Sequence, residues 1–331
     1  MSSTALQKEL QLLISKALSD LPIPESPHTL YEPYTYALNV GGKRIRPFLT
    51  LLANGLCGGN IKEALPAALA IEILHNFTLV HDDIMDCAET RRGKPSVFSK
   101  WNDHVAILTG DVMFADAFKQ LSFYGNSDAY TKQEYAAINN AFIKSTITVC
   151  EGQALDMEFV DRETVLLSDY IQMIEGKTSA LIVGALQMGA ISAHATQEQC
   201  DKLAQLGSEM GKAFQIQDDL LDAIADPEKF GKKAGGDIYE GKKTYLTLLA
   251  LQRANADQKN SILATLDKEK ATDVDVQEVL NLYLTLNVIE DIKIEIQNHY
   301  YKTYSLLDEF KDSKFKQELK KLLIFLQNRD H

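Results

Sequence analysis

Apolar residues recur at helical spacing from the start of the chain. Five of them lie three or four positions apart, on one face of a helix: Leu6, Leu10, Leu13, Ala17 and Leu21. Pro22 follows at once and predicts the end of this helix. Sustained alternation of apolar and polar residues, the pattern of a half-buried strand, is hard to find anywhere. The sequence therefore predicts an all-α fold.

The placement of proline supports long helices in the rest of the chain. Seven of the eight prolines lie at or before Pro95, and only Pro227 follows. Because helix interiors exclude proline, residues 96–331 can hold long helices with one interruption. No linker or low-complexity tract divides the chain, so we expect a single helical domain over residues 1–331. Residues 226–243, rich in Gly and Lys, are expected to form the longest functional loop.

No segment predicts a membrane span or a secretory signal. The most apolar stretch, residues 179–195, is interrupted by Gln187 and Ser192 and is shorter than the roughly 20 residues that a bilayer requires. We expect it to be a buried helix. The N-terminus lacks a charged segment followed by an apolar one. The four cysteines are scattered, without zinc or disulfide spacing, which favours free thiols and a cytoplasmic location.

The net charge of −12 and the pI of about 5.1 argue against nucleic acid or an anionic membrane as the main partner. An acidic protein that binds a polyanion needs local basic clusters or metal ions, and the sequence contains candidates for both.

Two identical Asp-Asp-x-x-Asp motifs are the strongest chemical signal. The motifs consist of Asp82, Asp83 and Asp86, and of Asp218, Asp219 and Asp222. On a helix, each triplet falls within an arc of about 100°. Such carboxylates repel one another, and a divalent cation removes the repulsion; oxygen ligands of this kind suit Mg2+. The alternative for one motif alone is a solvated acidic face, but two motifs in apolar surroundings favour metal binding.

Basic clusters stand against this acidic background. They are Lys43-Arg44-Ile45-Arg46, Arg91-Arg92-Gly93-Lys94, Lys232-Lys233 and Lys242-Lys243, together with Lys177 after Gly176. Arginine forks match phosphate oxygens, and lysine provides a mobile charge. Metal ions and cations together predict a diphosphate substrate. The alternative for each lysine pair is solvated surface charge. For His75, seven residues before Asp82, ordinary packing and a phosphate contact both remain open.

These segments resemble the trans-isoprenyl diphosphate synthases, the family of farnesyl and geranylgeranyl diphosphate synthases. The stretches that carry the resemblance are GGKRIRP (41–47), LVHDDIMD (79–86), RRGKPS (91–96), GD (110–111), GQALD (152–156), GKTSAL (176–181), FQIQDDLLD (214–222) and GGDIYEGKKTYL (235–246). They occur in the family's order over the middle 200 residues. The resemblance implies a helical bundle around a central active-site cavity, usually in a homodimer.

The resemblance also implies a role for individual residues. Three Mg2+ ions on the allylic diphosphate would be held by Asp82, Asp83, Asp86, Asp218 and Asp222. The same diphosphate would be contacted by Arg91, Lys177, Lys232 and Lys242. Isopentenyl diphosphate, the second substrate, would be held by Lys43, Arg46, His75 and Arg92. The reacting centre would be lined by Thr178, Gln215 and Asp219.

Residues upstream of the first motif are expected to limit the product. Phe77 lies five residues before Asp82, about 7.5 Å along the helix axis, with Thr78 and Leu74 beside it. A large ring followed by a small side chain resembles short-chain members that make C20, sometimes C15. The alternative for Phe77 is ordinary core packing.

Two other functions share part of this pattern. A class I terpene cyclase also uses an Asp-Asp-x-x-Asp motif, but its second metal motif differs and it lacks the cationic stretch at 41–47. A non-catalytic subunit of a heteromeric synthase typically loses one aspartate motif, and both are intact here. The sequence therefore favours the catalytic synthase.

Overall fold

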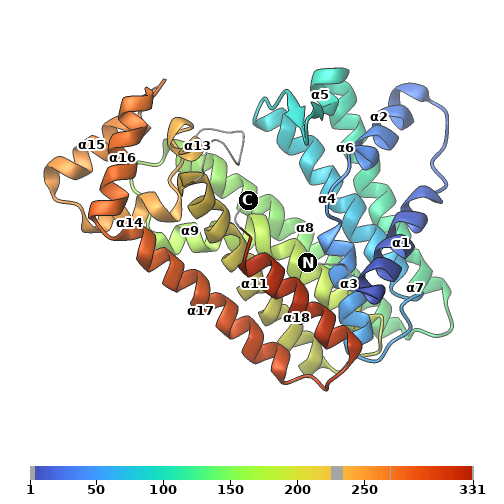
Figure 1. The fold of residues 1–331 in the computed structure, drawn as a ribbon. Helices are drawn as coiled ribbons and strands as arrows, with labels where there is room; N and C mark the ends of the chain where they lie inside the picture. The colour runs from blue at the N-terminus through green and yellow to red at the C-terminus, as the bar shows by residue number, and fades with distance from the viewer. Residues whose placement is uncertain (1–3, 225–233, 269, 330–331) are drawn as a thin grey trace. The chain divides into compact units, whose positions relative to one another are not determined.

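The computed structural model describes residues 4–224, 234–268 and 270–329. Contacts within the chain form two compact units, each described by itself. Unit 1 comprises Met1–Thr146, Leu181–Ala204 and Phe310–Leu319; unit 2 comprises Ile147–Ala180, Gln205–Glu309 and Lys320–His331. The expectation of one domain over residues 1–331 stays a prediction. The all-α prediction is confirmed, because helices make up almost all of the regular structure in the described ranges (Figure 1).

Unit 1 is built around one long helix. The elements that lie wholly within unit 1 are α1 (Ala5–Ser19), α2 (His28–Asn39), α3 (Ile45–Leu56), α4 (Leu65–Met85), β1 (Thr90–Arg91), β2 (Lys94–Pro95), α5 (Val97–Lys100), α6 (Asp103–Gln120) and α7 (Ser122–Asn126). Helix α4 packs against α3 and α6 (Figure 1). It buries Ala67, Ile71 and Leu74, which recur at helical spacing. This packing fixes the position of the first aspartate motif, at the end of α4.

The predicted first helix is confirmed in α1. Thr4 caps it, because its side chain accepts a hydrogen bond from the backbone N–H of Gln7 at 3.0 Å. The helix ends at Ser19, three residues before Pro22, the first of the prolines.

One short hairpin was not predicted. Strands β1 and β2 are antiparallel, and Thr90 is opposite Pro95. Arg92 and Gly93 form the turn with φ of 54° and 74°. Positive φ at both central residues is the signature of a type I′ turn, which favours a tight hairpin. The sequence pattern missed it because each strand has only two residues.

Unit 2 carries the second aspartate motif. The described elements that lie wholly within unit 2 are α9 (Leu167–Ile174), the π-helix η1 (Glu175–Ser179), α13 (Gly236–Tyr239), α14 (Tyr245–Arg253), α15 (Ala256–Leu266), α16 (Asp273–Thr285) and α17 (Val288–Asp308). Helix α14 packs against α15, α16 and α17. Four helices have residues in both units: α8 (Lys132–Asp161), α10 (Ala180–Ile191), α11 (Gln197–Ile224) and α18 (Lys314–Gln327).

Residues 180–191 of the apolar stretch form α10, and the stretch is largely buried, as predicted. Within the described ranges, no helix combines the length and the hydropathy needed to cross a bilayer.

Candidate active site

The first aspartate motif lies where α4 ends. Asp82 and Asp83 occupy the last turn, and Asp86 is the C-cap residue. The last carbonyl groups of a helix lack intrahelical partners and create a negative potential. Three carboxylates at this position increase that potential, so the end of α4 attracts cations.

Arg91 pairs with the buried member of this motif. Its Nε donates to Oδ1 of Asp83 at 2.8 Å, and its Nη2 also donates to that oxygen. The same Nη2 lies 3.8 Å from Oδ2 of Asp82. Burial raises the pKa of Asp83, and the guanidinium of Arg91 opposes this effect. The hairpin thus holds the guanidinium of Arg91 against the carboxylates, and Asp83 already has this side chain as a hydrogen-bond partner.

A cationic cavity of about 550 Å³ lies in unit 1. It is lined by Gly42, Lys43, Arg44, Ile45, Arg46, Glu72, His75 and Arg92. The four residues predicted to hold isopentenyl diphosphate are all among them, although they come from three separate parts of the sequence. The structure therefore brings this predicted set together.

Arg46 and His75 are neighbours in the lining of the cationic cavity. Nη1 of Arg46 lies 3.2 Å from Nε2 of His75. Burial, followed by the charges of the surrounding arginines, holds the pKa of His75 well below its usual value, so the neutral ring can accept from Arg46. Burial also lowers the pKa of Arg46 to about 10. Its Nε is buried without a hydrogen-bond partner among the described residues, which is costly unless a ligand supplies one.

Contacts of two arginines, Arg44 and Arg92, also shape this cavity, and these contacts were not predicted. Arg44 donates to the buried carboxylate of Glu72 and to the carbonyl of Leu38. Arg92 donates to the carbonyl of Gly41. Gly42 has a backbone φ of 133°, which side chains other than glycine rarely adopt, so this position of the motif favours glycine.

The second aspartate motif occupies the last turns of α11, and each carboxylate has its own protein partner. Nη1 of Arg329 lies 2.6 Å from Oδ1 of Asp218. The hydroxyl of Tyr170 donates to Oδ2 of Asp219. The backbone N–H of Asp237 donates to Oδ2 of Asp222 at 2.9 Å. These partners restrain each of the three side chains separately.

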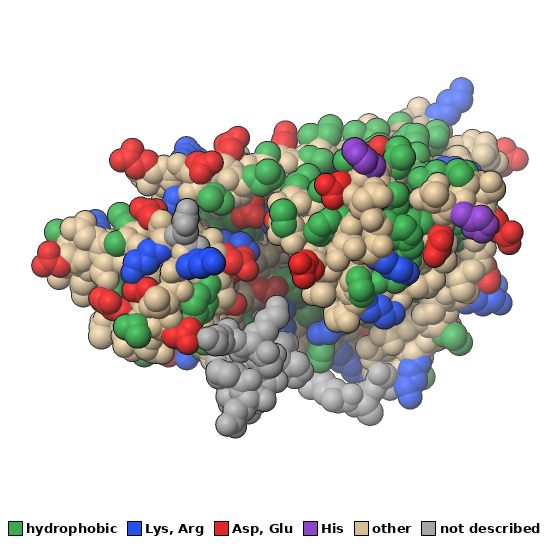
Figure 2. All heavy atoms as spheres, turned by 90° about the horizontal axis from the view of Figure 1, so that it is seen from above, with side chains coloured by type: hydrophobic (Ala, Val, Ile, Leu, Met, Phe, Trp, Pro, Cys, Tyr) green, Lys and Arg blue, Asp and Glu red, His purple; other side chains and the backbone are tan. Residues whose placement is uncertain are grey.

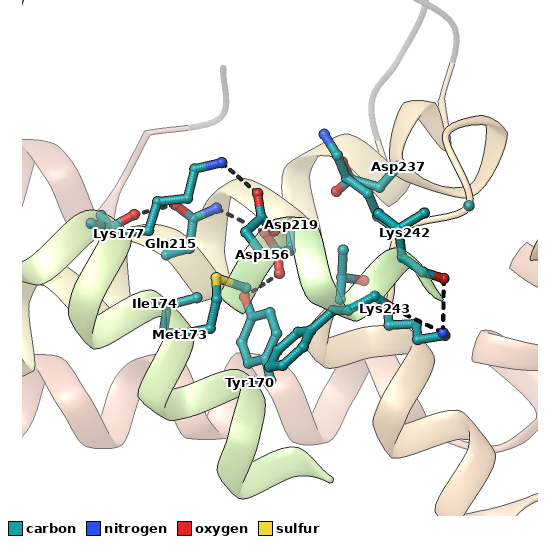
Figure 3. A pocket seen from close by; sticks show the side chains of 15 residues that line it. Asp156, Tyr170, Met173, Ile174, Lys177, Gln215, Asp219, Asp237, Lys242 and Lys243 are labelled. Carbon is teal, nitrogen blue, oxygen red and sulfur yellow. Dashed lines mark hydrogen bonds and ion pairs between the residues drawn. The ribbon is translucent and has the colours of Figure 1, made fainter. Parts of the chain in front are cut away.

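A cavity of about 110 Å³ lies beside Asp219 in unit 2 (Figure 3). Its polar lining includes Asp156, Tyr170, Lys177, Thr178, Gln215, Asp219, Asp237 and Lys242. Thr178, Gln215 and Asp219 were predicted to line one reacting centre, and the structure brings them together. The hydroxyl of Thr178 donates to Oε1 of Gln215 at 2.7 Å, and Nε2 of Gln215 donates to Oδ1 of Asp219 at 3.0 Å.

Asp219 therefore accepts hydrogen bonds at both oxygens. Burial, assisted by the charge of Asp237, raises its pKa to about 7. Tyr170 is fully buried, so its hydroxyl is dedicated to this carboxylate. Sequence reasoning missed Tyr170, because its partner lies 49 residues further along the chain.

Lys177 lies on the π-helix and pairs with Asp156 at 2.5 Å (Figure 3). The contact depends on two glycines. A Cβ at Gly152 would lie 2.1 Å from the backbone nitrogen of Lys177, and one at Gly176 would lie 2.7 Å from the Cα of Gly152. Isolated π-helical turns occur frequently at functional sites. Asp156 was not predicted, although its motif also contains the glycine that makes the contact possible.

The lysines near residue 240 differ in role. Lys242 lies 2.5 Å from Glu240 and 3.8 Å from Asp237. Burial alone would lower its pKa, but these carboxylates outweigh burial and raise it. Lys243 instead donates to the carbonyls of Phe159 and Arg162, at 2.9 and 2.6 Å, and so binds the end of α8. Lys232, predicted to contact the diphosphate, lies outside the described residues.

The predicted product-length residues lie on α4. Phe77 packs against the rings of His81 and Phe114, with centroids 4.8 and 5.7 Å away. Leu74 is fully buried, and the hydroxyl of Thr78 donates to the carbonyl of His75 at 2.8 Å. Their role in product length stays a prediction.

The donor set suits Mg2+ bound together with a substrate. Among the described residues, no group of three or more acidic, histidine or cysteine side chains is close enough to enclose a metal ion. Mg2+ is usually bound by one or two carboxylates with phosphate oxygens and water, so a complete protein cage is not required. The residues of both motifs fit that arrangement.

Comparison with known proteins identifies the family. Residues 27–283 match the polyprenyl synthetase family. The chain is 40% identical over 254 residues to a short chain isoprenyl diphosphate synthase of Methanocaldococcus jannaschii, with 76% of each chain covered. It is 42% identical over 250 residues to a geranylgeranyl diphosphate synthase of Saccharolobus solfataricus, covering 75% of this chain and 74% of that one.

Its fold is similar to the crystal structure of geranylgeranyl pyrophosphate synthetase from Pyrococcus horikoshii. The TM-score is 0.89 at 36% identity, and 97% of this chain and 96% of that chain are covered. The family match spans more than half of the sequence, and the relatives agree with it over about three quarters. The chain belongs to the polyprenyl synthetase family and is a prenyltransferase.

Proposed function

We propose that this enzyme joins isopentenyl diphosphate head to tail (1′-4) to an allylic diphosphate, with Mg2+ as cofactor. The observation that carries the proposal is that each unit places an aspartate triplet at a helix end together with cationic side chains. Carboxylates that hold metal and cations that contact phosphate are the two requirements for binding a diphosphate.

Unit 1 supports isopentenyl diphosphate binding. Lys43, Arg46, His75 and Arg92 line one cavity, and the buried Nε of Arg46 needs an acceptor. A diphosphate supplies acceptors and compensates the accumulated positive charge. Asp82 and Asp86 are proposed as metal ligands, whereas Asp83 acts both in the metal site and as the partner of Arg91.

Unit 2 supports the allylic half of the reaction. Asp218 and Asp222 are proposed metal ligands, and Lys177 and Lys242 contact the allylic diphosphate together with Arg91. Bound Mg2+ would supply Lewis-acid stabilisation of negative charge on the diphosphate oxygens. The resemblance gives three such ions, held by the carboxylates named above.

The side chains of the enzyme stabilise the charges that develop during the reaction. Lysine and arginine side chains stabilise the departing diphosphate, so the allylic C–O bond breaks and leaves a carbocation. Asp219 and Gln215 line the cavity, and their oxygen atoms would stabilise the positive charge. The double bond of isopentenyl diphosphate forms the new C–C bond, and a proton leaves to the released diphosphate. No protein nucleophile is needed.

We propose a short-chain product, C20, with C15 as the alternative. Support comes from the ring of Phe77 five residues before the first motif and from its packing on Phe114. A side chain of this size leaves little room for further growth along α4.

The proposal includes a homodimer formed through an apolar face of unit 1. Ile107, Phe114 and Phe118 are exposed and recur at helical spacing on α6. The rings of Phe114 and Phe118 pack on Phe142 of α8, and Ile143 is exposed beside it. Hydrophobic side chains gather on this part of the surface in Figure 2. Light scattering should give twice the chain mass, and Phe118→Asp should yield monomer.

Kinetics of two variants test the assignment of the substrates. Arg46→Gln should raise KM for isopentenyl diphosphate at least 10-fold, with a smaller effect on the allylic substrate. Lys177→Met should do the reverse. Equal effects of each variant on both KM values would contradict the assignment.

A further inference from the structure

The C-terminal segment places a guanidinium on the second aspartate motif. Nη1 of Arg329 lies 2.6 Å from Oδ1 of Asp218, more than 100 residues earlier in the chain. The Arg329 side chain is 9% exposed, whereas that of Asp218 is 40% exposed. The contact therefore joins a nearly buried cation to a carboxylate that still reaches solvent.

Arg329 is held by contacts that do not involve Asp218. Its Nη2 donates to the carbonyl of Phe214 at 2.7 Å. Its guanidinium lies 3.9 Å from the centroid of the Phe214 ring, a cation–π arrangement. Both contacts are on the same helix as Asp218, one turn earlier. The guanidinium is thus fixed relative to α11.

The backbone around Arg329 is anchored as well. Nε2 of Gln217 donates to the carbonyls of Gln327 and Arg329, at 3.1 and 3.3 Å. Tyr300 of α17 donates to Oε1 of Gln217 at 3.1 Å and fixes the orientation of the amide. Gln217 immediately precedes Asp218 in the sequence. Two consecutive residues of α11 therefore bind the C-terminal segment.

We infer that Arg329 is a positioning residue for Asp218, which it orients for Mg2+ on the bound diphosphate; this inference rests on the proposed function. A carboxylate that binds metal is usually held by a hydrogen-bond partner, and loss of that partner typically weakens metal binding by about 10–100-fold. Arg329 supplies such a partner, and it also offsets the repulsion among the three carboxylates at the end of α11.

The opposite role would be competition, in which Arg329 blocks the metal and leaves when the metal arrives. A competing counter-ion should be mobile and exposed. Arg329 is neither, because Phe214 and the Gln217 contacts hold it independently of the carboxylate. The two roles predict opposite signs for the effect of removing the guanidinium.

The test is calorimetric titration of the full-length protein with inorganic diphosphate at several Mg2+ concentrations. Arg329→Gln should raise the apparent dissociation constant for Mg2+ about 10–100-fold. Arg329→Lys retains the charge but loses the fork, and should give an intermediate value. Tighter Mg2+ binding in Arg329→Gln would establish competition and overturn the inference, and an unchanged constant would also overturn it.

Arg253→Gln is the matched control. Arg253 is an arginine of unit 2 that also pairs with an aspartate, Asp291, and donates to two backbone carbonyls, and none of these partners belongs to either motif. The Arg253→Gln variant should leave Mg2+ binding unchanged, while its loss of stability should be similar to that of Arg329→Gln. A second control is the Asp218→Asn background, in which Arg329→Gln should have no further effect on Mg2+ binding.

Failure of the inference differs from failure of the proposed function. If the unaltered enzyme neither elongates an allylic diphosphate nor binds diphosphate with Mg2+, the proposed function fails and the inference fails with it. If the unaltered enzyme does both and Arg329→Gln matches Arg253→Gln in Mg2+ binding, only the inference fails.

Discussion

Tyr170 donates its buried hydroxyl to Oδ2 of Asp219 on a different helix. Gln215 occupies the other oxygen of the same carboxylate at 3.0 Å. Two donors on two oxygens allow the carboxylate one orientation, with its charge at the edge of the cavity in unit 2. The reacting centre is therefore defined by a tertiary contact as well as by the aspartate motif.

Replacing this hydroxyl should reduce turnover. A hydrogen bond to a charged group contributes about 1.5–3 kcal/mol, so Tyr170→Phe should lower kcat about 10-fold or more while KM for isopentenyl diphosphate changes little. Tyr283→Phe is the matched control, because Tyr283 is equally buried and shares a 2.7 Å hydrogen bond with Thr247. Steady-state kinetics of both variants, with melting temperatures, separate the effects. An equal loss of kcat in both would indicate a general structural effect.

Product length should depend on Phe77. Phe77→Ala removes a ring that packs against Phe114, so the growing chain should extend and products longer than C20 should appear. Phe123→Ala, on α7, is the control because that ring packs on Tyr124 and Tyr130 instead. Mass analysis of the products gives the answer. The proposal that Phe77 limits product length is wrong if both variants give products of the same chain length as the unaltered enzyme.

Gly152→Ala should destabilise the protein, although helix propensity alone predicts stabilisation by about 1 kcal/mol in the interior of α8. The new Cβ would lie 2.1 Å from the backbone nitrogen of Lys177. Overpacking against backbone costs about 1–3 kcal/mol, so the net sign reverses. Urea denaturation measures the free energy of unfolding. Higher stability of the variant would show that this contact is absent.

The contribution of Glu209 to the free energy of unfolding should depend on pH. Burial alone would raise its pKa, but hydrogen bonds from His299 and Lys212, at 2.6 and 2.7 Å, outweigh burial and lower it to about 2. A carboxyl whose folded pKa lies below its unfolded value stabilises the fold above the unfolded pKa, about 4.3, and loses that contribution as pH falls toward 2. Glu209→Gln should therefore cost about 1–3 kcal/mol near neutral pH and progressively less below pH 4.

Glu198→Gln is the control for this experiment. Glu198 lies on the same helix and pairs with Lys202 at 2.8 Å, but it is exposed to solvent. Exposed pairs contribute little, so its replacement should leave the unfolding curves nearly unchanged at each pH. A loss for Glu209→Gln that stays constant from pH 7 to pH 3 would rule out the ionised carboxylate as its cause.

The sequence predicted those features that depend on local pattern. Helical periodicity and proline placement predicted α1, and an apolar stretch predicted the buried α10. The repeated triplets predicted carboxylates grouped on helices, and the structure places them near the ends of α4 and α11. The motif around residues 41–47 predicted the cations that line one cavity with His75. These signals lie within a few residues of one another, where spacing carries structural information.

The features that were missed depend on contacts between distant segments. Asp156 meets Lys177 only because a π-helical turn and two glycines let the backbones approach. Tyr170 and Arg329 pair with α11 across 49 and more than 100 residues, and nothing in their own sequence neighbourhood marks a partner. Glycine in both the 152–156 and 176–181 motifs was the one local signal that could have indicated close packing.

Elongation of labelled isopentenyl diphosphate tests the central claim most directly. The purified enzyme is incubated with this label and dimethylallyl, geranyl or farnesyl diphosphate, with Mg2+ or EDTA, and the product mass is measured. We predict that, with Mg2+, the label is incorporated into a product no longer than C20. With EDTA, no label should be incorporated. Diphosphate release without incorporated label would contradict the account and indicate a terpene cyclase. The absence of any reaction with Mg2+ would indicate a non-catalytic subunit.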